Sequence, residues 1–182
     1  MRALRGFLCR SPQQPDAAGG VNSDRPASVV RVEILTESGE ESLEIEDPRR
    51  RMTDVLNGED ILTGRRLTDE GEVPSPAAKW EVIDIDSLLV VVPPEHSTDS
   101  RQRLHRPGHP VRLRVGPYLV EGLAHVPPGA QATAFLQRHG PRFVALTRAT
   151  ITAVDRDRPA KSVRVAIINL RQAESLAEDS GL

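Results

Sequence analysis

The sequence predicts a mainly β protein with short helices, built from two tandem small units that each form a strongly bent sheet or a partly open barrel. Apolar and polar residues alternate over residues 30–34 and again over 111–115, which is the period of a half-buried strand. A short segment with helical spacing of apolar residues follows each run, and an aliphatic run closes each half. Because the same patterns recur in the same order, we interpret the halves as a degenerate internal repeat.

The first half, residues 29–93, begins with a predicted β-hairpin. Residues 30–36 and 42–46 alternate in polarity on either side of a turn at 37–40. The run at 80–92 has too many apolar positions for one exposed strand, so we predict a strand pair with a bend inside it. The residues predicted to form that bend are Asp84, Asp86 and Ser87.

A short helix is predicted between the hairpin and this strand pair. Its apolar face consists of Met52, Val55 and Leu56. Thr53 is predicted as the N-cap, because its hydroxyl can accept a free backbone N–H. Asn57 and Gly58 suit the end of the helix, because both residue types tolerate the left-handed conformation. Ile61 and Leu62 are predicted to start a further strand.

The second half, residues 109–171, shows the same order of patterns. Further strands are predicted at 118–126, 143–146 and 163–167, and a charged loop at 155–161. The residues that match Thr53, Val55 and Leu56 in order are Thr133, Phe135 and Leu136. The spacing supports a duplication, because Val30 to Leu56 spans 26 steps and Val111 to Leu136 spans 25.

The segments outside the two halves lack the periodicity of a folded element. Residues 1–28 are predicted to form a disordered tail, and residues 94–108 a linker. Residues 172–182 are helix-prone but polar, so we expect a C-terminal tail that frays. Cys9 is the only cysteine, and no apolar run approaches the ~18–20 residues of a membrane span. These features predict a cytoplasmic protein without a membrane interaction.

The predicted helix resembles a motif of an uncharacterised bacterial family of small β-domains, a domain of unknown function. That family has a turn of the type Arg-Leu-Ser-Asp-x-Leu-Asn. The matching residues here are Arg51, Asp54, Leu56 and Asn57, whereas Met52 and Thr53 depart from the motif. The second half keeps only Thr133 and Leu136. The resemblance implies a compact β-domain, here in tandem, and supplies no catalytic residue.

Charge separates the two halves. Residues 29–93 hold 7 basic and 16 acidic residues, a net charge of −9. Residues 109–171 hold 10 basic and 3 acidic residues, a net charge of +7. Such asymmetry has several interpretations. The halves dock on each other, the basic half binds an anionic partner, the acidic half of one molecule meets the basic half of the next, or the charges are solvated faces without a partner.

No motif in the sequence indicates an enzyme, a cofactor or a metal. Asp84 and Asp86 are interpreted as bend or surface residues, and prolines make a shared helix for His105 and His109 improbable. We therefore predict a non-enzymatic protein-interaction or scaffold protein that binds another protein or itself. The alternative is a nucleic-acid-binding module of weak affinity. Its candidate contacts to a polyanion or an acidic partner are Arg112, Arg114, Arg138, Arg142, Arg148 and Arg164.

Units this small bury little area alone. We therefore predict that the halves pack together about a pseudo-twofold axis and share an aliphatic core. The predicted core residues are Val32, Ile34, Leu56, Ile85, Leu113, Phe135, Leu136 and Ile167.

Overall fold

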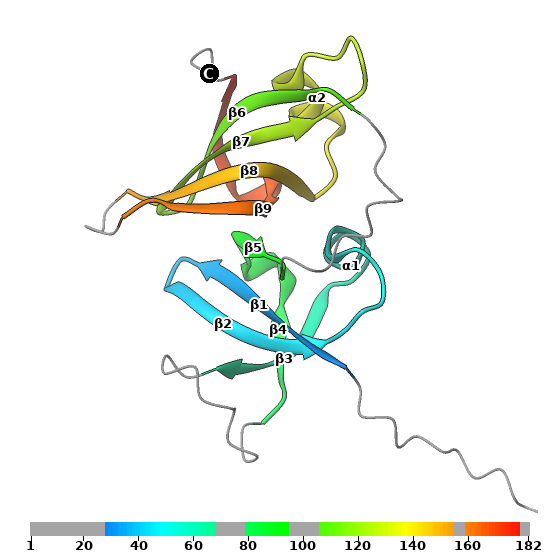
Figure 1. Cartoon of the computed structure of the whole chain (residues 1–182), viewed down its shortest axis with the longest axis vertical. Helices are drawn as coiled ribbons and strands as arrows, with labels where there is room; N and C mark the ends of the chain where they lie inside the picture. Colours follow the sequence, from blue (N-terminus) through cyan, green and yellow to red (C-terminus); the bar gives the residue numbers. More distant parts are fainter. Residues whose placement is uncertain (1–27, 68–78, 95–105, 155–158, 179–182) are drawn as a thin grey trace, which may run out of the picture.

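The structure, a computed structural model, describes residues 28–67, 79–94, 106–154 and 159–178. These residues form one open antiparallel sheet of ten strands in the order β10-β6-β7-β8-β9-β5-β1-β2-β3-β4 (Figure 1). The predicted mainly β class is therefore confirmed. The tail at 1–27, most of the linker, part of the 155–161 loop and the last four residues lie outside the described residues.

The two halves contain the same kinds of element in the same order. The first half has β1 (Val29–Thr36), β2 (Gly39–Glu46), α1 (Met52–Gly58), β3 (Ile61–Leu67), β4 (Glu81–Asp84), the 3-10 helix η1 (Ile85–Ser87) and β5 (Val90–Val92). The second half has β6 (Gly108–Val115), β7 (Tyr118–His125), α2 (Ala132–His139), β8 (Phe143–Ala153), β9 (Lys161–Asn169), the 3-10 helix η3 (Leu170–Gln172) and β10 (Ala173–Glu178).

Each group of five strands is curled. In the first half β5 pairs with β1, although β4 and β5 lie at opposite ends of the order β5-β1-β2-β3-β4. Only η1 and two residues join those two ends along the chain, so the group must bend round to bring them together. The second half does the same, since β10 pairs with β6 and η3 joins β9 to β10.

The two groups join along β9 and β5, which makes the sheet continuous. Val90 pairs with Ile168 and Val91 with Ile167. The backbone N–H of Asn169 adds a hydrogen bond to the carbonyl of Leu89, with an N···O distance of 3.0 Å. The halves therefore pack together, as predicted, but not about a twofold axis. A twofold axis would relate equivalent strands at the junction, whereas β9 is equivalent in order to β4 and not to β5.

The core is aliphatic and shared between the halves. Phe143 and Ile167 of the second half belong to the buried cluster of the first half. Leu35, Leu89 and Val90 of the first half belong to the cluster of the second half. All predicted core residues are buried except Phe135, which is half-buried and packs on the edge of the second cluster. Neither half therefore has a complete core of its own.

The predicted bend within residues 80–92 is present as η1. The carboxylate of Asp84 accepts a hydrogen bond from the backbone N–H of Asp86, at 2.8 Å, and caps the 3-10 turn. This short-range bond satisfies a backbone donor that the turn leaves free. None of the helices in the described part of the chain has the length and apolar character needed to cross a membrane.

Thr53 is not the predicted N-cap, because α1 begins at Met52 and Arg51 is the N-cap without a side-chain bond to the helix. The helix ends at Gly58 as predicted, but the chain leaves it extended rather than left-handed, with Glu59 at φ −119°. The prediction of a fraying C-terminal helix is wrong, because residues 173–178 form β10. A register shift between Ala173 and Ser175 interrupts the alternation that identifies a strand.

Candidate interaction surfaces

Two of the six predicted contact arginines are neutralised within the second half. The guanidinium of Arg112 on β6 lies 2.5 Å from the carboxylate of Glu121 on β7. Arg114 lies two residues further along β6, and its Nε is 3.2 Å from the carboxylate of Glu174 on β10. A side chain that alternates to the outer face of a strand meets its cross-strand partner there. Both arginines therefore have acidic neighbours that compete with any external anion.

A third predicted arginine, Arg142, lies at the junction between the halves. Its side chain is only 11% exposed, and its Nη2 is 2.5 Å from Oδ1 of Asp86 on η1. The guanidinium also lies over the ring of Phe143, 5.3 Å from the centroid. The role that the structure supports for Arg142 is to join the two halves. It is not positioned on an open face to bind a polyanion.

The remaining three arginines, Arg138, Arg148 and Arg164, are exposed and form no ion pair with any described residue. Arg148 on β8 and Arg164 on β9 lie on adjoining strands, between the paired residues Thr147–Val165 and Ala149–Val163. They are not paired with each other, and Arg148 interrupts the regular strand with a φ of +52°. Arg138 lies on α2, so the structure brings together only two of the six.

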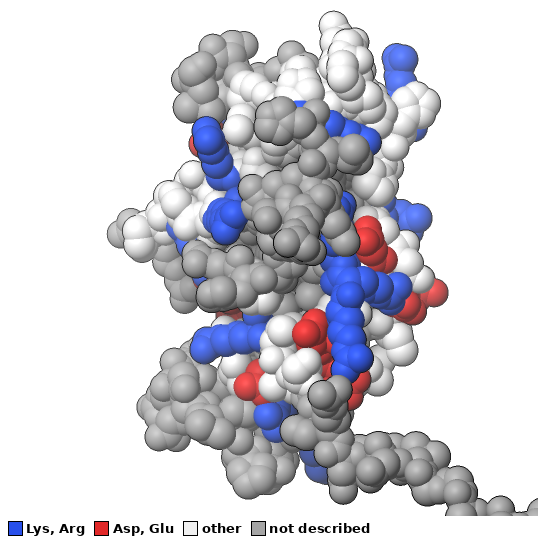
Figure 2. Space-filling model, turned by 45° about the vertical axis from the view of Figure 1, so that its right-hand side comes forward, with Lys and Arg blue, Asp and Glu red and all other residues white. Residues whose placement is uncertain are grey.

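Opposite charges meet at the junction itself. The ion pairs that the described residues form between the halves join an acid of the first half to a base of the second: Arg142 with Asp60 and Asp86, Arg171 with Asp86, and Lys161 with Glu33 and Glu40. Figure 2 shows the same division, with blue side chains dominating the upper half and most red ones in the middle and lower half. Docking of the two halves within one chain is therefore the use of charge that the structure shows.

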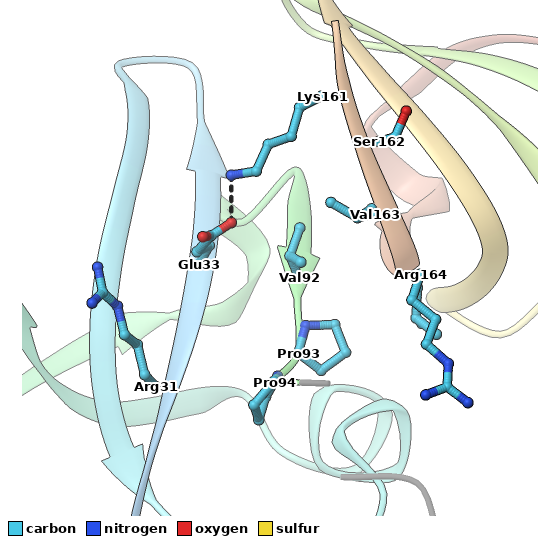
Figure 3. A pocket seen from close by; sticks show the side chains of 10 residues that line it. Arg31, Glu33, Val92, Pro93, Pro94, Lys161, Ser162, Val163 and Arg164 are labelled. Atoms are coloured by element: carbon cyan, nitrogen blue, oxygen red, sulfur yellow. Dashed lines mark hydrogen bonds and ion pairs between the residues drawn. The ribbon is translucent and has the colours of Figure 1, made fainter. Parts of the chain in front are cut away.

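Lys161 lies at a cleft on this junction. The cleft has a volume of about 340 Å³ and lies between β1, β9 and the Pro93-Pro94 turn after β5. Figure 3 shows Lys161 reaching from β9 to Glu33 on β1, with an Nζ···Oε2 distance of 2.5 Å, while Arg164 points away from the pair. Glu40 binds the same ammonium from β2.

The pKa of Lys161 reflects these partners. Partial burial lowers the pKa, but hydrogen bonds and charge attraction from Glu33 and Glu40 outweigh burial, so the pKa lies above its usual value of 10.5. A lysine that acts as a nucleophile or base needs a lowered pKa. Lys161 is therefore suited to holding β9 against β1 and β2.

In the described part of the chain β4 has no strand on its outer side, and this edge carries an exposed apolar strip that the sequence did not indicate. Ile61 at the start of β3 is 56% exposed, Val82 on β4 is 68% exposed, and Trp80 just before β4 is 44% exposed. The guanidinium of Arg65 lies 5.8 Å from the Trp80 ring centroid. We call Ile61, Trp80 and Val82 the β4-edge strip. The apolar run at 80–92 was visible in the sequence, but which of its side chains stay uncovered depends on the order of the strands in the sheet.

Within the described ranges no cluster of three or more His, Cys, Asp or Glu side chains is close enough to hold a metal ion. Asp84 and Asp86 serve the η1 bend and the Arg142 ion pair, as their interpretation as bend residues predicted. His125 is hydrogen-bonded to Thr147, at 2.8 Å, and His105 lies outside the described residues.

Comparison with known proteins identifies no relative. No protein-family model, no curated protein and no solved structure matches the chain. The resemblance of Arg51, Asp54, Leu56 and Asn57 to an uncharacterised β-domain family stays a prediction. All four residues lie at α1 or its N-cap.

Proposed function

We propose that this chain is a non-enzymatic protein-interaction or scaffold protein whose binding surface is the free edge of the sheet at β4. The observation that carries the proposal is the β4-edge strip, Ile61, Trp80 and Val82, beside a strand that, among the described residues, pairs on one side only. An edge strand presents free N–H and C=O groups that can bind an added strand. Apolar side chains next to that edge supply binding energy that hydrogen bonds alone do not.

The remainder of the molecule suits a rigid platform. The junction ion pairs and the shared core fix the two halves relative to each other. Some of the acidic residues of the first half form ion pairs with basic residues of the second half in that contact. A partner therefore meets one preformed surface, which lowers the entropic cost of association.

The proposal is tested by placing a photo-activated cross-linking residue at Val82 of the full chain in its native cell. The expected result is a covalent adduct with one discrete polypeptide, identified by mass spectrometry and then shown to bind the purified chain. The same residue placed at Val154 is the matched control, because Val154 is apolar and 46% exposed but lies at the end of β8. Equal, nonspecific labelling at both positions would contradict the proposal.

A second candidate function, weak polyanion binding, is favoured by one observation: Arg148 and Arg164 are both exposed on the adjoining strands β8 and β9. Its test uses the full chain, because the core of the second half includes residues of the first. Anisotropy titration with single-stranded and duplex nucleic acid should show weak, salt-sensitive binding without sequence preference. Replacing both arginines with alanine should abolish it, whereas replacing Arg112 and Arg114 should change it little, because both already pair with carboxylates.

A further inference from the structure

The junction between the halves joins two strands whose counterparts are the free ends of the sheet. The first half has the strand order β5-β1-β2-β3-β4, and the second half has the order β10-β6-β7-β8-β9. By position in these orders, β9 corresponds to β4 and β5 corresponds to β10. The pairing of β9 with β5 therefore shows how a β4-type edge and a β10-type edge fit together. Within the ranges that the structure describes, one edge of each type is left unpaired.

The two 3-10 helices fix the correspondence residue by residue. Asp84 and Asn169 each cap the 3-10 helix that follows, by accepting a bond from the backbone N–H two residues later. Asp84 therefore corresponds to Asn169. Two residues before these caps, Val82 corresponds to Ile167, and seven residues after them, Val91 corresponds to Leu176. The registers agree, because Val91 pairs with Ile34 of β1 as Leu176 pairs with Leu113 of β6.

The β4-edge strip matches residues that are covered at the junction. Asp84 pairs with Ile61 and Asn169 pairs with Phe143, so Ile61 corresponds to Phe143. Phe143 is 1% exposed and Ile167 is 2% exposed, because both pack into the core of the first half. Their counterparts Ile61 and Val82 are 56% and 68% exposed. The third strip residue, Trp80, corresponds to Val165, which packs on the same core.

The other end of the sheet carries the matching empty groove. A groove of about 370 Å³ lies between the end of α2, η3 and β10. Its lining includes Gln137, Ala173 and Leu176, which correspond to Asn57, Leu88 and Val91. In the first half, the residues at these three positions contact the second half. Asn57 donates a hydrogen bond to the backbone carbonyl of Phe143, the Leu88 carbonyl accepts a hydrogen bond from the Asn169 side chain, and Val91 pairs with Ile167.

Opposite charges would also meet if β4 of one copy contacted β10 of another copy in the way that β9 contacts β5. Arg142 precedes β8 as Asp60 precedes β3, and Arg171 lies in η3 as Asp86 lies in η1. The ion pair between Arg142 and Asp86 at the junction therefore becomes an ion pair between Asp60 of one copy and Arg171 of the next. The signs are exchanged, but an acid still faces a base.

We propose that copies of this chain associate head to tail, with β4 and the β4-edge strip of one copy docking on β10 and the groove beside α2 of the next. This inference rests on the proposed function, because it names the partner of the same edge. Val82 of one copy then pairs with Leu176 of the other. The contact is weaker than the internal junction, since Glu174 and Ser175 replace Leu89 and Val90, so the association is reversible and depends on concentration.

A directed disulfide tests this pairing in the full chain, with Cys9 replaced by serine so that introduced cysteines are the only thiols. One variant carries Val82→Cys and the other Leu176→Cys. Cα atoms of opposite residues in an antiparallel pair lie about 4.5–5.5 Å apart, within reach of a disulfide. Mixing the two variants with oxidised glutathione should give a disulfide-linked heterodimer, and neither variant alone should give a homodimer. Leu176→Cys mixed with Val154→Cys is the matched control.

Sedimentation velocity and the emission of Trp80, the only tryptophan, report association of the unmodified chain. Raising the concentration from low to several hundred micromolar should increase the sedimentation coefficient and shift the Trp80 emission to the blue as the edge becomes covered. Val82→Lys should weaken this association by about tenfold or more, because a charge at an edge strand opposes pairing. Val154→Lys should leave it unchanged.

Two outcomes overturn the inference: a monomer at every concentration without a mixed disulfide, or a homodimer of Val82→Cys alone, which indicates symmetric edge pairing. Failure of the inference is distinguishable from failure of the proposed function. If the cross-linker at Val82 captures a different polypeptide while the chain stays monomeric, only the inference fails. If Val82 also behaves like Val154 in the cell, both fail.

Discussion

Asn57 and Phe143 exchange two hydrogen bonds across the junction of the halves. The Phe143 N–H donates to Oδ1 of Asn57 at 2.8 Å, and Nδ2 of Asn57 donates to the Phe143 carbonyl at 2.9 Å. The same Nδ2 also donates to the carbonyl of Thr53 at 2.8 Å, which orients the amide from within α1. The Asn57 amide therefore makes the two hydrogen bonds to Phe143 that a residue of a neighbouring strand would make. These bonds connect α1 of the first half to the start of β8 in the second half.

Asn57→Ala should destabilise the fold by about 1–3 kcal/mol, because it leaves the N–H and the carbonyl of Phe143 without these partners at a partly buried site. Urea unfolding followed by circular dichroism measures the change. Gln137→Ala is the matched control, because Gln137 occupies the corresponding place on α2 and is exposed. Equal effects of the two substitutions would show that the cross-junction bonds contribute nothing.

The sequence predicted most strand segments, with β10 as the exception, and most of the aliphatic core, because both depend on local alternation of polarity. It assigned Asn57 to a helix end, since a local role needs only neighbouring residues. Its actual partner is 86 residues away in the chain. The pairing of β9 with β5 could not be predicted for the same reason, because no local sequence pattern indicates which strand edges meet. The exposed strip at Ile61 and Val82 was missed for that reason.

Leu56→Ala should cost about 2–5 kcal/mol, because Leu56 is fully buried on α1 in the core that also takes in Phe143 and Ile167. Thermal or urea unfolding measures the loss. Because the core is shared, both halves should unfold in one transition in the variant as in the parent chain. An unchanged stability would remove Leu56 from the core, and two separate transitions would show that the halves fold independently.

Gly116→Ala should destabilise the chain more than Gly129→Ala. Both glycines have positive φ, +53° and +80°, so alanine strains the backbone at either position. At Gly116, in the β6–β7 turn, a Cβ would also lie 2.8 Å from a methyl of Leu89 in the first half, whereas nothing lies within 4 Å at Gly129. The difference between the two losses of unfolding free energy measures the crowding at the junction. A larger loss at Gly129 would contradict this packing.

Lys161 should make stability fall at alkaline pH. Its folded-state pKa is raised above 10.5 by Glu33 and Glu40, so the folded chain holds the proton more tightly than the unfolded chain does. That contribution is fully present below pH 10.5 and is lost as the pH rises through the higher folded-state pKa. The ammonium is about a third exposed, so solvent screening limits the effect to roughly 1 kcal/mol or less.

The measurement compares urea unfolding of the parent chain and of Lys161→Met at neutral pH and above pH 11. The parent should be the more stable at neutral pH, and the difference should shrink at high pH as Lys161 loses its proton in the folded state. The other ionisable groups are present in both proteins, so their effects cancel in the comparison. Lys79→Met removes the only other lysine and should show no such pH-dependent difference. A difference that stays constant with pH would mean that Lys161 stabilises the junction through its alkyl chain rather than through its charge.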